Sequence, residues 1–87
     1  MTTDKILKAE KEGKTIYGAK ETIKALRHGE VETIFLAATC PAKLQHDIST
    51  MADMAKISVA NLDVNSEELA AQLKKPFSIN VIGIKRK

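Results

Sequence analysis

Apolar residues along the chain recur with two different spacings, and the two spacings alternate. Four short runs rich in apolar or β-branched residues predict strands at residues 15–17, 33–38, 58–62 and 79–84, and the run at 33–38 is nearly continuously apolar. Before and between these runs, apolar residues three or four positions apart predict helices near residues 3–12, 19–28, 41–55 and 65–75. Strands that alternate with helices imply a mixed or parallel sheet flanked by helices, with right-handed crossovers.

The helix predicted after Gly18 has one apolar face and one cationic face. The apolar stripe consists of Ala19, Thr22, Ile23 and Leu26. The opposite face carries Lys20, Lys24, Arg27 and His28, with Glu21 at its margin. Lys20 and Lys24 repel each other, because side chains four positions apart are neighbours on a helix. A helix that needs only a solvated surface would alternate charges there.

The cationic face begins next to Gly18, and this position is suited to anion binding. The first N–H groups of a helix lack partners within it, and the positive end of the helix dipole attracts phosphate. Gly18 has no Cβ, so a ligand could approach its backbone closely. Charge alone nevertheless favours an ordinary solvated face. Gly18, Lys20 and Lys24 are therefore candidates that need further support.

Composition narrows the classes of function. A chain of 87 residues suffices for one small domain, and its net charge of +3 is compatible with a nucleic-acid partner without establishing one. A single cysteine favours a reducing compartment, and no apolar run approaches membrane-spanning length, so we expect a cytoplasmic protein without membrane contact. The aromatic residues are Tyr17, Phe35 and Phe77. These are too few to stack single strands, so a nucleic-acid partner should be structured RNA or a duplex.

The sequence carries no signature of a cofactor- or metal-dependent enzyme. It has no phosphate-binding loop, no dinucleotide glycine fingerprint and no His/Cys set with metal spacing, so we expect no cofactor, no metal and no catalytic residue. Cys40 is the one candidate nucleophile, because it follows a strand and precedes a helix start, where the dipole lowers a thiol pKa. A buried structural cysteine is the favoured interpretation, since neither His28 nor His46 is near it in sequence to act as a base.

Residues 18–29 (GAKETIKALRHG) and 34–41 (IFLAATCP), followed in the same order by residues 48–59 and 68–84, resemble the ribosomal L7Ae/L30e family of RNA-binding proteins. The resemblance is closest to the L30e branch and covers about residues 4–84. It implies one domain spanning residues 1–87, with an α/β fold: a three-layer α-β-α sandwich around a small mixed sheet of about four strands. It also implies binding to kink-turn RNA, a sharply bent duplex with tandem sheared G·A pairs beside an internal loop.

The resemblance assigns site residues to two segments. In the family, the turn before the second helix and the first residues of that helix enter the groove at the G·A pairs, and the loop before the last strand covers a flipped-out nucleotide. The groove contacts correspond to Gly18, Lys20, Glu21 and Lys24, and Arg27 lies on the same cationic face. The covering loop corresponds to Phe77, Ser78 and Ile79. That loop meets the carboxyl ends of the other strands only if the last strand is antiparallel.

Four positions depart from the family pattern. Lys20 replaces an asparagine of the L7Ae branch, so a base-specific amide contact is not expected there. Thr39 replaces an asparagine usual in the L30e branch, which weakens a role for its loop. Ala70 and Lys74 replace common glycines, so the last helix and its exit are expected to be shaped differently.

The leading hypothesis is a protein that recognises kink-turn or related internal-loop RNA, as a large-subunit ribosomal protein of the L30e type. It would act without catalysis, be a monomer when free, and bind rRNA or another kink-turn RNA beside other ribosomal proteins. The alternative is a protein-interaction module of a translation or ribosome-rescue factor, which the loss of asparagine at Lys20 keeps open. The role of Phe77 and Ile79 also stays open, because alternation with Val81 turns one of them into the core.

Overall fold

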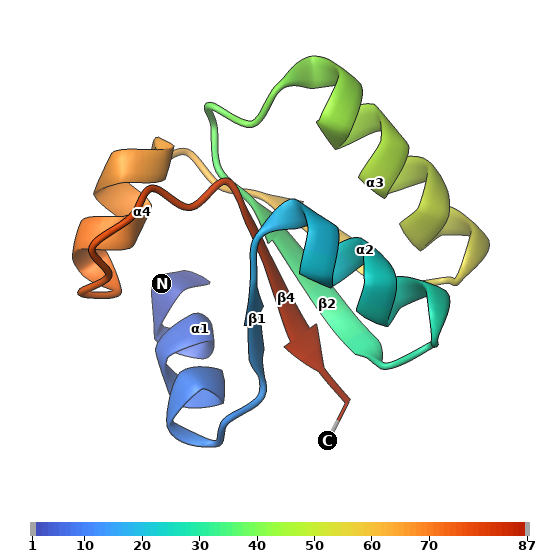
Figure 1. Ribbon diagram of the computed structural model, residues 1–87, viewed down its shortest axis with the longest axis horizontal. Helices are drawn as coiled ribbons and strands as arrows, with labels where there is room; N and C mark the ends of the chain where they lie inside the picture. Colours follow the sequence, from blue (N-terminus) through green and yellow to red (C-terminus); the bar gives the residue numbers. More distant parts are fainter. Residues whose placement is uncertain (1, 87) are drawn as a thin grey trace.

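The computed structural model describes the backbone of residues 2–86 and the side chains of residues 4–86. Over this part of the chain, helices and strands alternate (Figure 1). In chain order the elements are α1 (Thr2–Lys11), β1 (Thr15–Tyr17), α2 (Ala19–Arg27), β2 (Val31–Leu36), α3 (Ala42–Met54), β3 (Ser58–Asn61), α4 (Ser66–Gln72) and β4 (Val81–Lys85). The α/β alternation predicted from the spacing of apolar residues is confirmed.

The strands form one mixed sheet in the order β1-β4-β2-β3. Strands β2 and β3 are parallel, whereas β4 is antiparallel to both β1 and β2. The carboxyl ends of β1, β2 and β3 therefore lie at the same edge as the beginning of β4. We call this edge the rim. The loop before β4 thus reaches the rim, as it could only with an antiparallel last strand.

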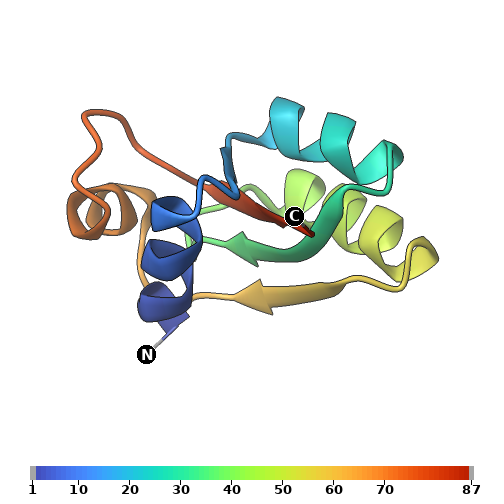
Figure 2. The ribbon, with the colours of Figure 1, turned by 90° about the horizontal axis from the view of Figure 1, so that it is seen from below.

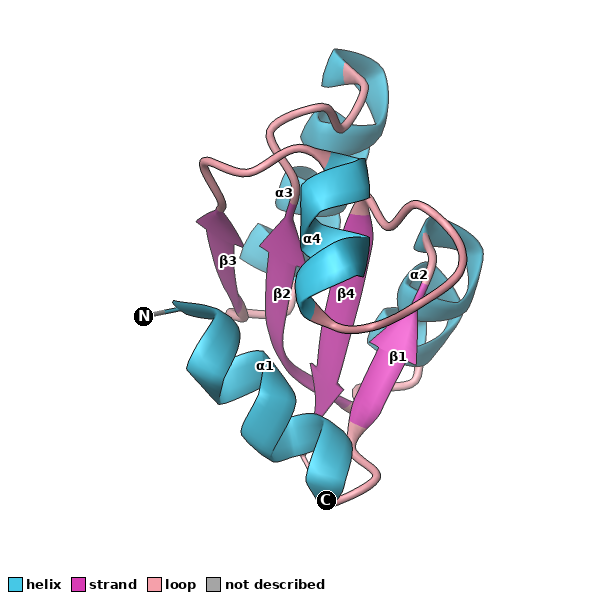
Figure 3. Ribbon diagram, turned by 90° about the vertical axis from the view of Figure 1, so that its left-hand side faces the viewer, coloured by secondary structure: helices cyan, strands magenta, loops and turns pink. Residues whose placement is uncertain are grey.

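Helices cover both faces of the sheet and complete the predicted three-layer sandwich. Figure 3 shows α1 and α4 in front of the sheet and α2 and α3 behind it, and Figure 2 shows the same separation. Each face has its own cluster of buried apolar side chains. Strand β2 contributes to both, with Phe35 in the cluster under α1 and α4, and with Ile34 and Leu36 in the other. This explains why its sequence is nearly continuously apolar.

Helix α2 lies especially close to strand β4. Thr22 is fully buried, and its Cγ2 lies 3.0 Å from the position that a Cβ on Gly83 would occupy. The absence of a side chain at Gly83 therefore lets the helix approach the sheet. This contact holds the N-terminus of α2 at the rim, beside the beginning of β4.

Helix α4 begins as predicted but ends earlier. The Asn65 side chain caps it by accepting a hydrogen bond from the Glu68 N–H at 2.7 Å. The expected helix up to Lys75 instead stops at Gln72, in a Schellman turn in which the Lys75 N–H donates to the Ala70 carbonyl at 2.9 Å. Lys74 adopts φ 57° in this turn, the left-handed conformation that favours glycine. The helix exit therefore forms without the glycine common in the family.

The boundaries of three strands also differ from those predicted. The strand expected at 58–62 ends one residue earlier, at Asn61. The strand expected at 33–38 lies at Val31–Leu36, and the strand expected at 79–84 lies at Val81–Lys85. Ile79 consequently belongs to the loop before β4 rather than to the strand itself. Pro41 is the N-cap of α3 rather than its first residue.

Candidate nucleic-acid interface

The turn at Gly18 joins strand β1 to helix α2 at the rim. Gly18 adopts φ 95°, where a side chain would be strained, although a Cβ there would meet no atom within 4 Å. Its N–H donates to the Val81 carbonyl at 3.0 Å, and its own carbonyl accepts from the Thr22 N–H at 3.1 Å. Gly18 has no side chain to cap the helix, so the N–H groups of residues 19–21 remain for an outside acceptor, as the sequence predicts.

Helix α2 turns its predicted apolar stripe inward and its cationic side chains outward. Within the stripe Thr22 and Leu26 are buried, and Ala19 and Ile23 are partly buried. Ala25, which the stripe did not include, is buried as well, whereas the cationic side chains are exposed. The exposed candidate residues on this helix are Lys20, Glu21, Lys24 and Arg27. The N-terminal end of α2 thus presents positive charge beside unpaired N–H groups, an arrangement that favours phosphate.

A groove of about 330 Å³ brings the two predicted segments of the site together. It is lined by the β1–α2 junction, by one residue of α3 and by the loop that leads into β4. The lining residues are Tyr17, Gly18, Ala19, Leu44, Phe77, Ser78, Ile79, Asn80 and Val81. The turn and the loop are far apart in the sequence, and the antiparallel direction of β4 places them side by side.

The loop before β4 has one apolar side chain outside and one inside. Phe77 is 50% exposed and Ser78 is exposed as well, so both can contact a ligand. Ile79 is only 2% exposed, and its side chain belongs to the core cluster that also contains Leu69 of α4 and Leu73, the residue that follows α4. The expectation that Ile79 covers a nucleotide is therefore corrected, because this residue faces the core and supports the loop from beneath.

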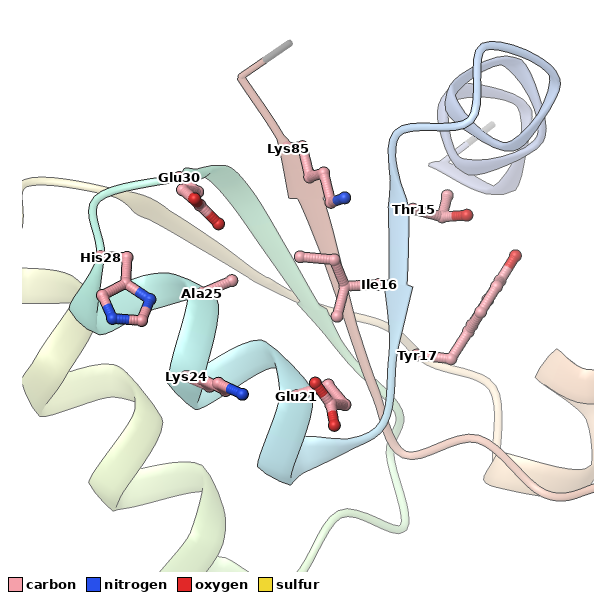
Figure 4. Close-up of a pocket in the computed structure, with 9 residues that line it drawn as sticks. All are labelled: Thr15, Ile16, Tyr17, Glu21, Lys24, Ala25, His28, Glu30 and Lys85. Atoms are coloured by element: carbon pink, nitrogen blue, oxygen red, sulfur yellow. The ribbon is translucent and has the colours of Figure 1, made fainter.

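Glu21 and Lys24 border a second hollow, of about 360 Å³, between α2 and β1 (Figure 4). Glu30, Lys85 and His28 also line it, so both signs of charge are present. The ring of Tyr17 points away from this hollow, towards the other side of β1 (Figure 4). The predicted loop residues and Gly18 therefore line the groove, and Glu21 and Lys24 line the second hollow, whereas Lys20 and Arg27 line neither of these two concavities.

Sequence reasoning missed five residues that line the groove, namely Tyr17, Ala19, Leu44, Asn80 and Val81. The rings of Tyr17 and Phe77 meet edge to face, with centroids 6.5 Å apart and an interplanar angle of 74°. The only available signal for Tyr17 was its place directly before Gly18. Leu44 lies within the helix predicted near residues 41–55, and that prediction gave no indication of a position at the rim.

Thr39 ties together the loops that form the rim. Its hydroxyl donates to Asn80 Oδ1 at 2.9 Å and accepts from the Ser66 N–H at 2.9 Å. The Asn80 carbonyl also accepts from the Ala37 N–H at 2.9 Å. A threonine at this position was expected to weaken the role of its loop. That expectation concerns RNA binding and stays a prediction; within the fold, the hydroxyl links the segment after β2, the start of α4 and the loop before β4.

Cys40 is buried, as the favoured interpretation predicts. It is 7% exposed, and burial raises the pKa of its thiol, which disfavours the reactive thiolate at neutral pH. Among residues 4–86, no group of three or more His, Cys, Asp or Glu side chains could hold a metal ion. None of the helices in the described part of the chain combines the length and apolar character needed to cross a bilayer.

Comparison with known sequences gives a family match and a set of relatives. The sequence pattern of the "Ribosomal protein L7Ae/L30e/S12e/Gadd45 family" matches residues 2–87. A relative from Sulfurisphaera tokodaii, named large ribosomal subunit protein eL30, is 35% identical over 72 residues, which cover 83% of this chain and 68% of the relative. Proteins of the same name from Methanocaldococcus jannaschii and Methanosarcina mazei are 39% and 34% identical, over 77% and 91% of this chain. The matches span 61% and 73% of those two relatives.

Solved structures with the same fold are more distant in sequence. The 15.5kD RNA binding protein of Giardia lamblia superposes with a TM-score of 0.83 at 14% identity, over 94% of this chain and 68% of that protein. A protein of unknown function from Bacillus halodurans C superposes with a TM-score of 0.79 at 19% identity, over 88% and 76% of the two chains. At these identities the similarity establishes the fold.

Proposed function

Because the chain belongs to the ribosomal protein L7Ae/L30e/S12e/Gadd45 family, we propose that it binds kink-turn or related internal-loop RNA as a large-subunit ribosomal protein of the eL30 type. The observation that carries this proposal is the groove at the rim. There the turn at Gly18, with the open N–H groups of α2, lies beside the exposed ring of Phe77. An anion-binding element and an apolar element thus form one surface.

The two elements would act on different parts of a bent RNA. The N-terminus of α2, with Lys20 and Lys24, attracts backbone phosphates, which position the RNA without reading its sequence. Phe77 offers an aromatic surface to a base that has left the stack, as occurs at internal loops. Only an RNA that brings phosphates and an extruded base to the rim together satisfies both elements, and capture of this conformation would provide the selectivity.

The same proposal covers the remaining properties expected from the sequence. A ribosomal protein of this type is a single cytoplasmic domain, and the burial and raised pKa of Cys40 give no support to a catalytic role. Its partners would be rRNA and neighbouring ribosomal proteins. The runner-up, a protein-interaction module of a translation factor, predicts no preference for bent RNA.

The experiment compares Phe77→Ser with wild type by titration against a kink-turn RNA and against the same RNA without its G·A pairs. We expect Phe77→Ser to weaken binding to the kink-turn by about fivefold or more, since stacking on an aromatic side chain contributes about 1–3 kcal/mol per base. Binding to the second RNA should change little, because phosphate contacts remain.

Met54→Ser is the matched control, because Met54 is another exposed large apolar side chain and is 81% exposed at the end of α3. It should leave both affinities unchanged. If Phe77→Ser weakens binding to both RNAs in parallel and lowers the melting temperature, Phe77 serves folding and the proposal loses its apolar element.

A further inference from the structure

Four side chains from four separate segments meet beside the rim. We call them the Tyr17 cluster: Glu10 of α1, Tyr17 of β1, Lys75 of the turn after α4, and Phe77 of the loop before β4. In Figure 3 the chain from α4 to β4 passes over β1 on the same face of the sheet as α1. None of the first three residues was expected to have a role in ligand binding.

The contacts form a continuous series from α1 to the exposed ring. Lys75 Nζ lies 2.5 Å from Glu10 Oε1 and 5.0 Å from the centroid of the Tyr17 ring, within the range of a cation–π interaction. The Tyr17 ring then meets the Phe77 ring edge to face. The Phe77 ring therefore has a fixed neighbour on one side although half of its surface is exposed.

The charge of Lys75 is already engaged within the protein. The hydrogen bond from Lys75 lowers the pKa of Glu10, and the same bond raises the pKa of Lys75, so both groups are held in their charged forms. A lysine held by a carboxylate and an aromatic ring is poorly placed to neutralise RNA phosphate. Lys74, its neighbour in sequence, is exposed.

The Tyr17 hydroxyl makes neither of the two contacts that link the cluster to Phe77. Its oxygen is buried and makes no hydrogen bond of ordinary geometry among the described residues, although Glu10 and Thr15 lie near enough to influence the pKa of the hydroxyl. The contacts with Lys75 and Phe77 both come from the ring, so the ring is the part of Tyr17 that positions Phe77. Tyr17→Phe should therefore preserve the cluster, whereas Tyr17→Leu should remove both ring contacts.

We infer that Tyr17 and Lys75, with Glu10 behind them, are positioning residues that hold the Phe77 ring at the groove for RNA recognition. This inference rests on the proposed function. It assigns Lys75 a role that differs from that of Lys20 and Lys24, because Lys75 acts on the RNA through Tyr17 and Phe77. Helix α1, on the opposite face of the sheet from α2, thereby contributes to selectivity at the rim.

The test measures the affinity ratio between a kink-turn RNA and the same RNA without G·A pairs, at several salt concentrations. We expect Tyr17→Leu and Lys75→Met to reduce this ratio by about two- to tenfold, the range that corresponds to losing one aromatic contact. The slope of log affinity against log salt should not change, whereas loss of a phosphate contact would reduce it by about one. Tyr17→Phe should restore the wild-type ratio, and Lys74→Met is the control for loss of a neighbouring charge.

Each outcome has a distinct meaning. The positioning role is overturned if the ratio is unchanged in Tyr17→Leu and Lys75→Met, or if Lys75→Met lowers the salt slope and so identifies a phosphate contact. It is also overturned if the ratio falls only in variants that melt early. A wild-type protein without any preference contradicts the proposed function itself, and the positioning role with it.

Discussion

At the scale of one residue, Lys74 departs from the rule that a glycine occupies the left-handed position at the end of a helix. A lysine at φ 57° is strained, because the left-handed conformation brings Cβ close to the following carbonyl oxygen. The Schellman turn after α4 nevertheless requires this conformation, and the turn leads directly into Lys75 and Phe77, which both contact the Tyr17 ring. The backbone conformation of Lys74 therefore sets the direction in which the chain enters the loop before β4.

We predict that Lys74→Gly stabilises the protein. Relief of the left-handed strain exceeds the extra chain entropy that glycine gains on unfolding, so the free energy of unfolding should rise by about 0.5–1 kcal/mol. Urea unfolding measures the change. Lys8→Gly within α1 is the control and should destabilise by about 1 kcal/mol, because glycine in a helix interior has only the entropic cost. Equal destabilisation by both substitutions would contradict the conformational argument.

At the scale of the element, the two faces of helix α2 have different roles: the buried face contributes to folding, and the exposed face is proposed to bind RNA. Its buried face packs against β4 at Gly83, where any side chain would crowd Thr22, and its exposed face carries the lysines. Substitutions on the exposed face should therefore change binding without changing the fold.

We predict that combined replacement, Lys20→Ala with Lys24→Ala, weakens RNA binding and leaves stability within about 0.5 kcal/mol of wild type. Loss of two phosphate contacts should reduce the slope of log affinity against log salt by about two. The control, Lys5→Ala with Lys8→Ala, removes the same charge from α1 on the other face of the sheet and should change the slope less. An unchanged affinity and slope in the α2 variant would exclude this face as the RNA-binding site.

Helix α1 is tied to the turn after α4 by the Glu10–Lys75 ion pair, which makes this tie dependent on pH. The folded-state pKa of Glu10 lies below its ordinary value of 4.5, so the pair contributes stability above that pH and loses it as the pH falls through the lowered pKa. Glu10→Gln should thus lower the free energy of unfolding at pH 7, by a small amount because the pair is partly exposed to solvent, and should match wild type in strong acid.

Denaturant unfolding at a series of pH values tests this dependence, with Glu32→Gln as a control that removes an exposed carboxylate of strand β2. A difference between Glu10→Gln and wild type that is constant across pH would show that the pair contributes no charge interaction.

At the scale of the whole molecule, the spacing of apolar residues predicted the elements, because period and burial are linked within each helix or strand. It could not decide which of Phe77 and Ile79 faces the core, since that depends on where β4 begins and on how the preceding loop turns. The Tyr17 cluster could not be predicted from the sequence either, because its members come from four segments that only the folded sheet brings together. The turn at Gly18 could be predicted from the sequence, since a glycine before an amphipathic helix is a local signal.

The central claim is that the rim selects a bent RNA and does not merely attract any polyanion. The most direct measurement is titration of the wild-type protein, at one fixed salt concentration, with a kink-turn RNA and with the same RNA lacking its G·A pairs. We predict at least about tenfold tighter binding to the kink-turn, corresponding to about 1.4 kcal/mol. Equal affinities for the two RNAs would show that charge alone drives binding, and would contradict the account.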